Sequence, residues 1–356
     1  MTTTPSTTPS TTPPISAPLT SGRRTRRRVV PLVAAATAAA LALGACGGKQ
    51  PQGTAGAGGA TGAGGCEAGA GQVTIATGNS TGVYYVLGGG IASLMSAKSP
   101  LKATAAETGA SVQNIQQLVG GQYDIAFSLA DTAADAVAGK GSFSAPQKVQ
   151  ALGRIHSNYT QVVVRKASGI KTVADMKGKR ISTGSPKSGT EVIATRLLQA
   201  AGLDINSDVA AQRLELGKTV DAMKDGSIDG FVWSGGLPTP ALTDLFTSQK
   251  DAVELIDVTA GLAKMKDVNP VYAEGTIPAA TYGLPSDVRT IVVPNLLLVR
   301  DDFSAANACA LTKLIWGSSA ELAKVHPAAK ELTAETGPRT DPVPLAPGSK
   351  QAFDAL

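Results

Sequence analysis

Two loops of the sequence combine glycine with hydroxyl side chains directly after a short apolar strand. The first runs from Gly78 to Gly82 and reads GNSTG, and the second runs from Gly184 to Thr190 and reads GSPKSGT. The first loop has the G-x-S-x-G spacing of a serine hydrolase, whose serine attacks an acyl carbon. The second has the two glycines of a phosphate-binding loop. Acyl transfer, phosphate binding and solute binding without chemistry are therefore the three functions to compare.

Neither kind of catalytic or nucleotide site is supported by the surrounding sequence. A hydrolase has several strands before its nucleophile, whereas only a signal-like segment and a Gly/Ala-rich stretch precede Val73. The sequence holds two histidines, His156 and His326, and neither has the setting of a triad base. The residue after Gly189 is Thr190 rather than the lysine of a phosphate loop. We therefore expect no enzyme and no cofactor.

Both loops are predicted to lie at helix N-termini. Unpaired backbone N–H groups and the helix dipole favour a negative charge there, so a carboxylate would fit. The same residue types are also ordinary helix caps, which need no ligand. If both loops face one cleft, ligand binding is the favoured interpretation.

The two loops belong to an internal repeat. Strand, Thr-Gly turn and helix occur first around Gly78 and again around Gly184, and each copy is followed by a helix and a strand that begins near an aspartate. Gly78 and Asp124 are 46 positions apart, and Gly184 and Asp229 are 45 apart. Two βαβ lobes of similar wiring explain this, with a chance match of short segments as the alternative. The predicted fold class is α/β.

Apolar runs on either side of the second copy predict how the lobes are joined. We expect lobe 1 to comprise residues 72–160 and 295–356, and lobe 2 to comprise residues 161–294. The hinge would then be two crossing strands near 161–166 and 288–299. Helices between Leu311 and Lys330 would dock back on lobe 1. This gives a bilobal protein with a cleft between its lobes.

The net charge of +5 arises from one cluster of five arginines between Arg23 and Arg28. From residue 46 onward the chain has 27 Lys and Arg against 27 Asp and Glu. Because this part is neutral, a basic surface for nucleic acid is not predicted.

The arginine cluster begins a segment typical of an export signal. An apolar run follows it and ends in Leu43-Gly44-Ala45-Cys46, which resembles a bacterial lipobox. We predict a lipoprotein signal peptide over residues 1–45 and a lipid on Cys46 that anchors an extracytoplasmic protein to the outer face of the cell membrane. The run is shorter than the ~20 residues of a membrane span. A plain transmembrane anchor remains the alternative, and the export route, general or twin-arginine, stays open.

Residues 46–71 are rich in Gly and Ala and are predicted to be a flexible tether. Two further cysteines are Cys66 and Cys309. Outside the cytoplasm they could form a disulfide, or Cys309 could be a buried free thiol; the sequence leaves both open. Neither has the spacing of a metal site, and no metal is expected.

Several motifs together resemble one receptor family. They are Gly78 to Tyr85, Glu107 to Asn114, Met176 to Ile181, Ser188-Gly189-Thr190, Asp225 to Gly230 and Ile277 to Tyr282, in this order. The chain resembles the TAXI subfamily of TRAP transporter solute receptors over roughly residues 73–335. The resemblance implies a type II periplasmic-binding-protein fold and a monomer that passes a small carboxylate to a TRAP membrane permease. Glutamate-like amino acids and dicarboxylates are ligands of similar proteins. A binding lipoprotein for an ABC permease or a sensor is the alternative.

The resemblance also implies which residues contact the ligand. These predicted ligand-binding residues are Asn79, Ser80, Thr81, Tyr84, Ser128, Asp131, Ser185, Ser188, Gly189, Thr190, Trp233, Gly236 and Tyr282. For Tyr84 and Trp233, packing in the core is an equally good interpretation. Glu107 could receive a ligand ammonium, or it could cap a helix together with Ser111.

Overall fold

The computed structural model describes residues 65–356. The predicted signal peptide 1–45, the lipidation site Cys46 and most of the predicted tether 46–71 lie outside these residues. Within residues 65–356, no helix is long and apolar enough to cross a membrane.

The first copy of the repeat forms a parallel sheet in which β1 lies between β2 and β3. Helix α1 packs on this sheet through Leu87, Ile91 and Met95, which are all fully buried. Their spacing of four residues places them on one helix face, as in other amphipathic helices. The elements are β1 (Gly71–Ala76), α1 (Val83–Lys98), β2 (Leu101–Ala106), α2 (Ser111–Val119) and β3 (Ile125–Leu129).

The second copy has the same wiring, with β5 between β6 and β7 and all three strands parallel. Its elements are β5 (Arg180–Ser182), α4 (Gly189–Ala200), β6 (Ala210–Gln212), α5 (Leu216–Asp225) and β7 (Gly230–Gly235). The two aspartates are also equivalent. Asp124 accepts a hydrogen bond from the backbone N of Thr74 at 2.8 Å, and Asp229 accepts one from that of Arg180 at 2.9 Å. The predicted α/β fold with two βαβ lobes is confirmed.

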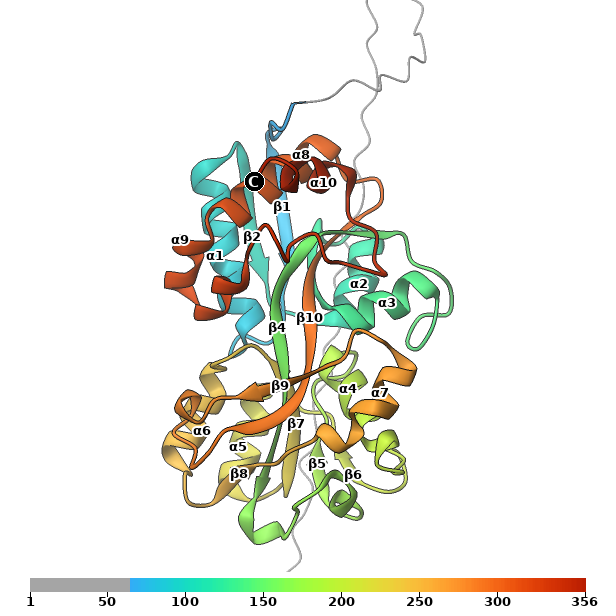
Figure 1. Ribbon diagram of the computed structural model, residues 1–356, viewed down its shortest axis with the longest axis vertical. Helices are drawn as coiled ribbons and strands as arrows, with labels where there is room; N and C mark the ends of the chain where they lie inside the picture. The colour runs from blue at the N-terminus through green and yellow to red at the C-terminus, as the bar shows by residue number, and fades with distance from the viewer. Residues whose placement is uncertain (1–64) are drawn as a thin grey trace, which may run out of the picture. The chain divides into compact units, whose positions relative to one another are not determined.

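Two long strands connect the lobes. β4 (Val149–Arg165) and β10 (Val288–Arg300) pair antiparallel, and together they lie at the centre of the strand order β2-β1-β3-β10-β4-β7-β5-β6. β10 pairs with β3 of the first lobe, and β4 pairs with β7 of the second. Figure 1 shows both strands running from one lobe into the other. The exact lobe boundaries and hinge positions given above stay a proposal.

The pairing of β4 with β10 is irregular where the lobes meet. The register shifts between Pro294 and Leu296, as in a β-bulge, and Asn295 lies at this point. A bulge turns a side chain out of the regular alternation of a strand. Asn295 is fully buried here, so its amide needs hydrogen-bond partners inside the protein.

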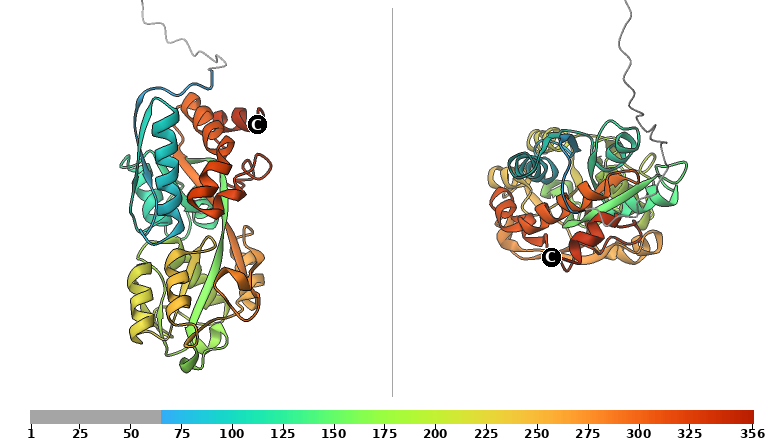
Figure 2. Two further views of the ribbon diagram at one scale, coloured as in Figure 1. Left: turned by 90° about the vertical axis from the view of Figure 1, so that its left-hand side faces the viewer. Right: turned by 90° about the horizontal axis from the view of Figure 1, so that it is seen from above.

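The remaining elements cover the two lobes. The C-terminal helices lie beside α1 (Figure 2), and Leu311 and Ile315 share a buried cluster with Leu87 of α1. The elements not yet named are α3 (Ala130–Ala138), α6 (Pro240–Ser248), β8 (Val253–Leu255), α7 (Leu262–Val268), β9 (Ala273–Ile277), α8 (Ala305–Gly317), α9 (Ser319–Val325) and α10 (Pro347–Phe353).

The first described residues are attached to helix α8 at two points. Cys66 and Cys309 form a disulfide with a Cα–Cα distance of 5.0 Å, so Cys309 is not the free thiol of the alternative interpretation. Three residues after Cys66, the backbone N of Gly69 donates to Oδ1 of Asn307 at 2.9 Å. The segment before β1 is therefore fixed to the first lobe.

Replacing both cysteines by serine should lower the free energy of unfolding by about 2–4 kcal/mol, because the disulfide restricts the unfolded chain. Urea unfolding of oxidised wild type and of the double variant measures this difference. Wild type treated with reductant is the matched control and should unfold like the variant. An unchanged urea midpoint in both would contradict a stabilising disulfide.

Candidate functional site

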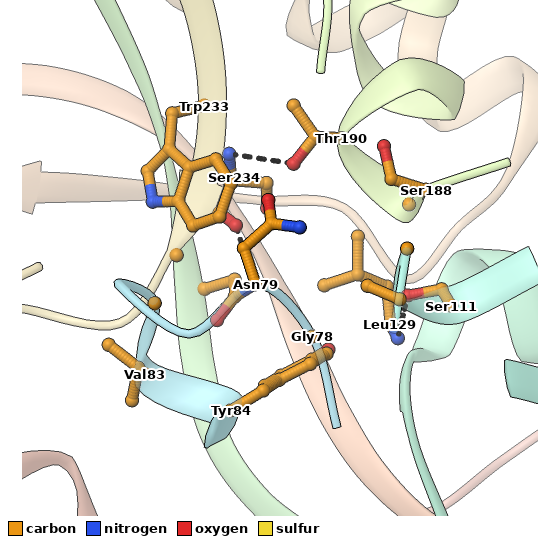
Figure 3. A pocket seen from close by; sticks show the side chains of 16 residues that line it. Gly78, Asn79, Val83, Tyr84, Ser111, Leu129, Ser188, Thr190, Trp233 and Ser234 are labelled. Atoms are coloured by element: carbon orange, nitrogen blue, oxygen red, sulfur yellow. Dashed lines mark hydrogen bonds between the residues drawn. The ribbon is translucent and has the colours of Figure 1, made fainter. Parts of the chain in front are cut away.

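A cavity lies where the two lobes meet, and both Thr-Gly turns contribute to it (Figure 3). The empty space between its walls, counted together with the open solvent at its mouth, is about 430 Å³. Trp233, at the end of β7, lies against the first loop, since an ideal Cβ on Gly82 would be 3.4 Å from its ring. The lining residues are Gly78, Asn79, Gly82, Val83, Tyr84, Gly109, Ala110, Ser111, Leu129, Asn158, Ser188, Gly189, Thr190, Trp233, Ser234 and Gly235.

Three helices begin at this cavity, namely α1, α2 and α4. Each follows a strand of its lobe's parallel sheet, and the carboxyl ends of such strands are where α/β sheets bind ligands. Neither α1 nor α2 has a side-chain cap or an acidic residue in its first turn. In α2 the backbone N of Gln113 already donates to the backbone O of Lys187 at 3.1 Å. The other N–H groups of these first turns and their partial positive charge remain available to an anion. In α4, the hydroxyl of Ser188 caps the N–H of Glu191 at 3.0 Å.

The lobes touch directly at Asn79. Its side-chain oxygen Oδ1 accepts hydrogen bonds from Oγ of Ser185 at 3.2 Å and from the backbone N of Leu216 at 3.1 Å. Leu216 is the first residue of α5, so an amide of the first lobe caps a helix of the second. Asn79 and Gly109 also line a second, outer hollow, formed with Glu107, Gln113, Ser185, Arg213 and Lys218 among others. Asn79 therefore separates the cavity from this outer hollow.

A buried polar network forms one wall of the cavity. The hydroxyl of Tyr84 donates to Oδ1 of Asn295, the residue at the bulge of β10. Nδ2 of Asn295 donates to Oδ1 of Asn158 at 2.7 Å and to the backbone O of His156 at 2.9 Å. Nδ2 of Asn158 donates to the backbone O of Ser234 at 3.1 Å. The network thus links both crossing strands to the end of β7.

Burial decides the protonation of this network. It raises the pKa of Tyr84, so the hydroxyl stays a donor at neutral pH. It lowers the pKa of His156 to about 4, so this imidazole is neutral. The wall is uncharged as a result.

Six of the predicted ligand-binding residues line the cavity, and they come from both lobes. They are Asn79, Tyr84, Ser188, Gly189, Thr190 and Trp233. Thr190 also receives a hydrogen bond, from the backbone N of Ser234 to its Oγ1 at 3.3 Å. This contact, drawn in Figure 3, joins the second loop to the end of β7.

Other predicted residues lie elsewhere. Ser80 and Thr81 are exposed, because the loop turns them outward before α1 begins. Ser185 lines the outer hollow rather than the cavity. Ser128 is fully buried and donates to the backbone O of Leu129 at 3.0 Å. Gly236 packs against His156, since an ideal Cβ on this glycine would be 3.3 Å from the ring.

Tyr282 is part of the second lobe's core. Its hydroxyl donates to Oε1 of Gln161 at 2.6 Å and accepts from the backbone N of Thr239 at 2.8 Å. Its ring stacks on Phe246 with centroids 5.4 Å apart. Tyr282 is therefore not among the residues that line the cavity, although the resemblance implied a contact with the ligand.

Asp131 takes part in a buried ion pair between the lobes. Its carboxylate lies 2.8 Å from Nη1 of Arg196, which belongs to α4 of the second lobe, and it also accepts from the hydroxyl of Tyr272. Nη2 of Arg196 pairs with Asp135. The side chains of Asp131 and Arg196 are 0% and 9% exposed. Asp131 therefore holds the lobes together instead of lining the cavity.

The sequence predictions missed several lining residues, among them Ser111, Leu129, Asn158 and Ser234. Ser111 begins α2, and four residues separate it from the end of β2. Because ligands bind at the carboxyl ends of such strands, this position could have been predicted from the sequence. Asn158 lies inside a long strand and faces the cavity only because β4 passes between the lobes. No local sequence signal marks it.

The fold is that of a type II periplasmic binding protein. A family model described as the NMT1-like family matches residues 75–354. The chain belongs to this family of periplasmic-binding-protein-like solute receptors.

Solved structures with little sequence identity have the same fold. A binding protein component of an ABC phosphonate transporter from Pseudomonas aeruginosa is 13% identical, with a TM-score of 0.51 over 74% of this chain and 81% of that chain. A protein from Bordetella bronchiseptica is 22% identical, with a TM-score of 0.50 over 80% of this chain and 89% of that chain. An alkanesulfonate-binding protein from Xanthomonas axonopodis pv. citri, bound to MOPS, is 17% identical, with a TM-score of 0.46 over 80% and 83%.

Replacing Arg196 by methionine should favour separation of the lobes. Closing the variant would bury Asp131 and Asp135 without their cation, and losing one partner of a buried pair costs about 3–5 kcal/mol. Small-angle scattering should show a larger radius of gyration than for wild type.

Arg289→Met is the matched control, because Arg289 forms only exposed pairs with Glu274 and Asp257 in the second lobe. Its scattering curve should equal that of wild type. If Arg196→Met also gives the wild-type curve, the buried pair does not hold the lobes together.

The buried His156 should make stability depend on pH. Its pKa falls from 6.5 in the unfolded chain to about 4 in the folded protein, so the unfolded state binds the additional proton between these values. Stability is therefore complete above pH 6.5 and should fall by about 3 kcal/mol as the pH drops toward 4. Urea unfolding across this range, with His156→Asn as comparison, measures the effect. If the free energy of unfolding falls with pH equally in wild type and in His156→Asn, the effect does not come from His156.

Proposed function

We propose that the protein is an extracytoplasmic receptor that encloses a small organic anion between its lobes. One observation carries this proposal: three helix N-termini, those of α1, α2 and α4, meet at one cavity. The first turns of α1 and α2 contain no acidic side chain, and Glu191 in the first turn of α4 is paired with Arg213 at 2.6 Å. Such a site binds carboxylates and other oxyanions.

Binding would act by shifting a conformational equilibrium. A ligand that contacts both lobes stabilises the closed state by the difference between its affinities for the closed and the open forms. Asn79 belongs to the first lobe, and Thr190 and Trp233 belong to the second. All three line one cavity, so a ligand there can contact both lobes. No covalent step is required. The closed surface is then what a membrane permease would recognise.

We assign the receptor to a TRAP-type secondary transporter, with glutamate-like amino acids and dicarboxylates as the first ligands to test. The ordered motifs shared with the TAXI subfamily support this assignment. The arginine cluster and the Leu43-Gly44-Ala45-Cys46 motif support export and a lipid anchor on Cys46. A tether of small residues would keep the receptor at high local concentration near its permease.

The second candidate function is delivery of the solute to an ABC permease. It is favoured by the fold shared with a binding protein component of an ABC phosphonate transporter. The energy source of uptake distinguishes the two candidates, since a TRAP permease uses an ion gradient and an ABC permease uses ATP.

The purified protein is screened against small carboxylates by thermal unfolding. At least one of them should raise its melting temperature, because a ligand that binds the folded state stabilises it. Thr190→Val keeps the side-chain shape but removes the hydroxyl from the cavity. For the carboxylate found, affinity should fall roughly tenfold or more by calorimetry, because a hydrogen bond to a charged group contributes about 1.5–3 kcal/mol.

Ser80→Ala is the matched control, because Ser80 is exposed and does not line the cavity. Its affinity should remain that of wild type. A loss of affinity in Ser80→Ala but not in Thr190→Val would place the ligand outside this cavity. If no small anion binds, the proposed receptor function is wrong.

A further inference from the structure

The cavity has no charged side chain among its described lining residues, neither basic nor acidic. The carboxylates nearby are already engaged. Asp131 does not line the cavity, and its buried carboxylate is already paired with Arg196. Glu107 lines only the outer hollow, and its Oε1 accepts from the backbone N of Ser80 at 2.8 Å. A ligand cation inside the cavity would therefore meet no counter-ion.

The hydrogen-bond donors of the cavity, in contrast, include free ones. The first turns of α1 and α2 have no side-chain caps. The hydroxyl of Ser234 is buried and has no partner within residues 65–356, although Ser234 lines the cavity and is only 5% exposed. A buried hydroxyl without a partner is rare in a folded protein and calls for an explanation. A ligand oxygen would provide its partner.

The acceptors of the cavity are largely used by the protein itself. Oδ1 of Asn158 accepts from Asn295, and Oδ1 of Asn79 accepts from Ser185 and Leu216. Three backbone carbonyl oxygens of the lining are also occupied. The backbone O of Gly78 accepts from the backbone N of Thr108. The backbone O of Ser234 accepts from Nδ2 of Asn158, and that of Gly235 accepts from Nε2 of Gln161.

The hydroxyl oxygens follow the same pattern. Oγ of Ser111 accepts from the backbone N of Leu129 at 3.1 Å, and Oγ1 of Thr190 accepts from that of Ser234. The hydroxyl proton of Thr190 remains available to a ligand. The indole N–H of Trp233 is the exception among the donors, because it already donates to Oγ1 of Thr239 at 3.2 Å.

These observations define what the cavity can solvate. A carboxylate would receive several hydrogen bonds from helix ends and hydroxyls, which favours its charged form. An ammonium group has three donors and no acceptor. Apart from the hydroxyl oxygen of Ser234, the acceptors named above already receive a hydrogen bond from the protein, so the ammonium would have to share them. Burying such a charge without partners is strongly unfavourable.

Resting on the proposed function, we infer that the receptor binds a small carboxylate without an ammonium group, such as an oxo or hydroxy acid or a plain dicarboxylate. It rejects the amino acid of the same shape. Selection arises from the unpaired ammonium and needs no steric clash, because an amino group and a hydroxyl are similar in size. Of the ligands first assigned to the receptor, this retains the dicarboxylates and removes the amino acids.

Matched pairs of ligands test the inference on the wild-type protein. The pairs are L-lactate with L-alanine, succinate with L-aspartate, and 2-oxoglutarate with L-glutamate, and each compound is titrated by calorimetry. For every pair that binds, the acid without nitrogen should bind roughly a hundredfold or more tightly than its amino counterpart. Ser234→Ala should weaken binding of the acid, because it removes the hydroxyl without a partner.

The outcomes separate this inference from the proposed function. If an amino acid binds as tightly as its partner acid, the inference is wrong, and the face of Trp233 becomes the candidate contact for the ammonium. The receptor function would then still stand. If an amino acid binds and its partner does not, the inference is likewise wrong. If neither member of any pair binds, both the inference and the proposed carboxylate receptor fail.

Discussion

The antiparallel pairing of β4 with β10 is the constraint on which the rest of the structure depends. Both strands belong to both lobes, so the sheets cannot separate without breaking this pair. Rotation of one lobe against the other has to occur within these two strands. The bulge next to Asn295 interrupts their regular ladder where the lobes meet. The same residue connects Tyr84 of α1 with Asn158 of β4, so the crossing strands and the cavity wall are built from shared side chains.

Two different kinds of contact hold the lobes together around the cavity. Close to it, Asn79 makes neutral hydrogen bonds to the second lobe. Farther away, Arg196 pairs with two carboxylates of α3. Because Arg196 and its carboxylates do not line the cavity, helix ends, hydroxyls and amides are the polar groups of its described lining. The charged contact between the lobes and the polar groups of the cavity are therefore made by different residues.

The sequence predicted the features that depend on local pattern. The repeated Thr-Gly turns, the parallel strands behind them and the aspartates at equivalent points all follow from alternation and turn chemistry, and the structure has them. The cavity itself was predicted in part. Asn79, Ser188 and Thr190 lie in it because helix N-termini and strand ends meet at one edge of each sheet.

The remaining residues depend on contacts between distant segments. Asp131 follows a strand in the expected way, yet its role is decided by Arg196, 65 positions along the chain. Tyr282 belongs to a motif of the resemblance but is fixed by Gln161 on a crossing strand. Asn158 looks like any polar residue in a strand until β10 and β7 are placed beside it. Spacing along a sequence carries no information on such partners.

The attachment of Cys66 and Gly69 to helix α8 has a mechanical consequence. Both fastenings lie on the lobe that carries β1, so any pull on the chain ahead of Cys66 is borne by that lobe alone. The other lobe is joined to it through β4 and β10 and shares neither fastening. A force applied ahead of Cys66 would therefore reach the second lobe only through these two strands.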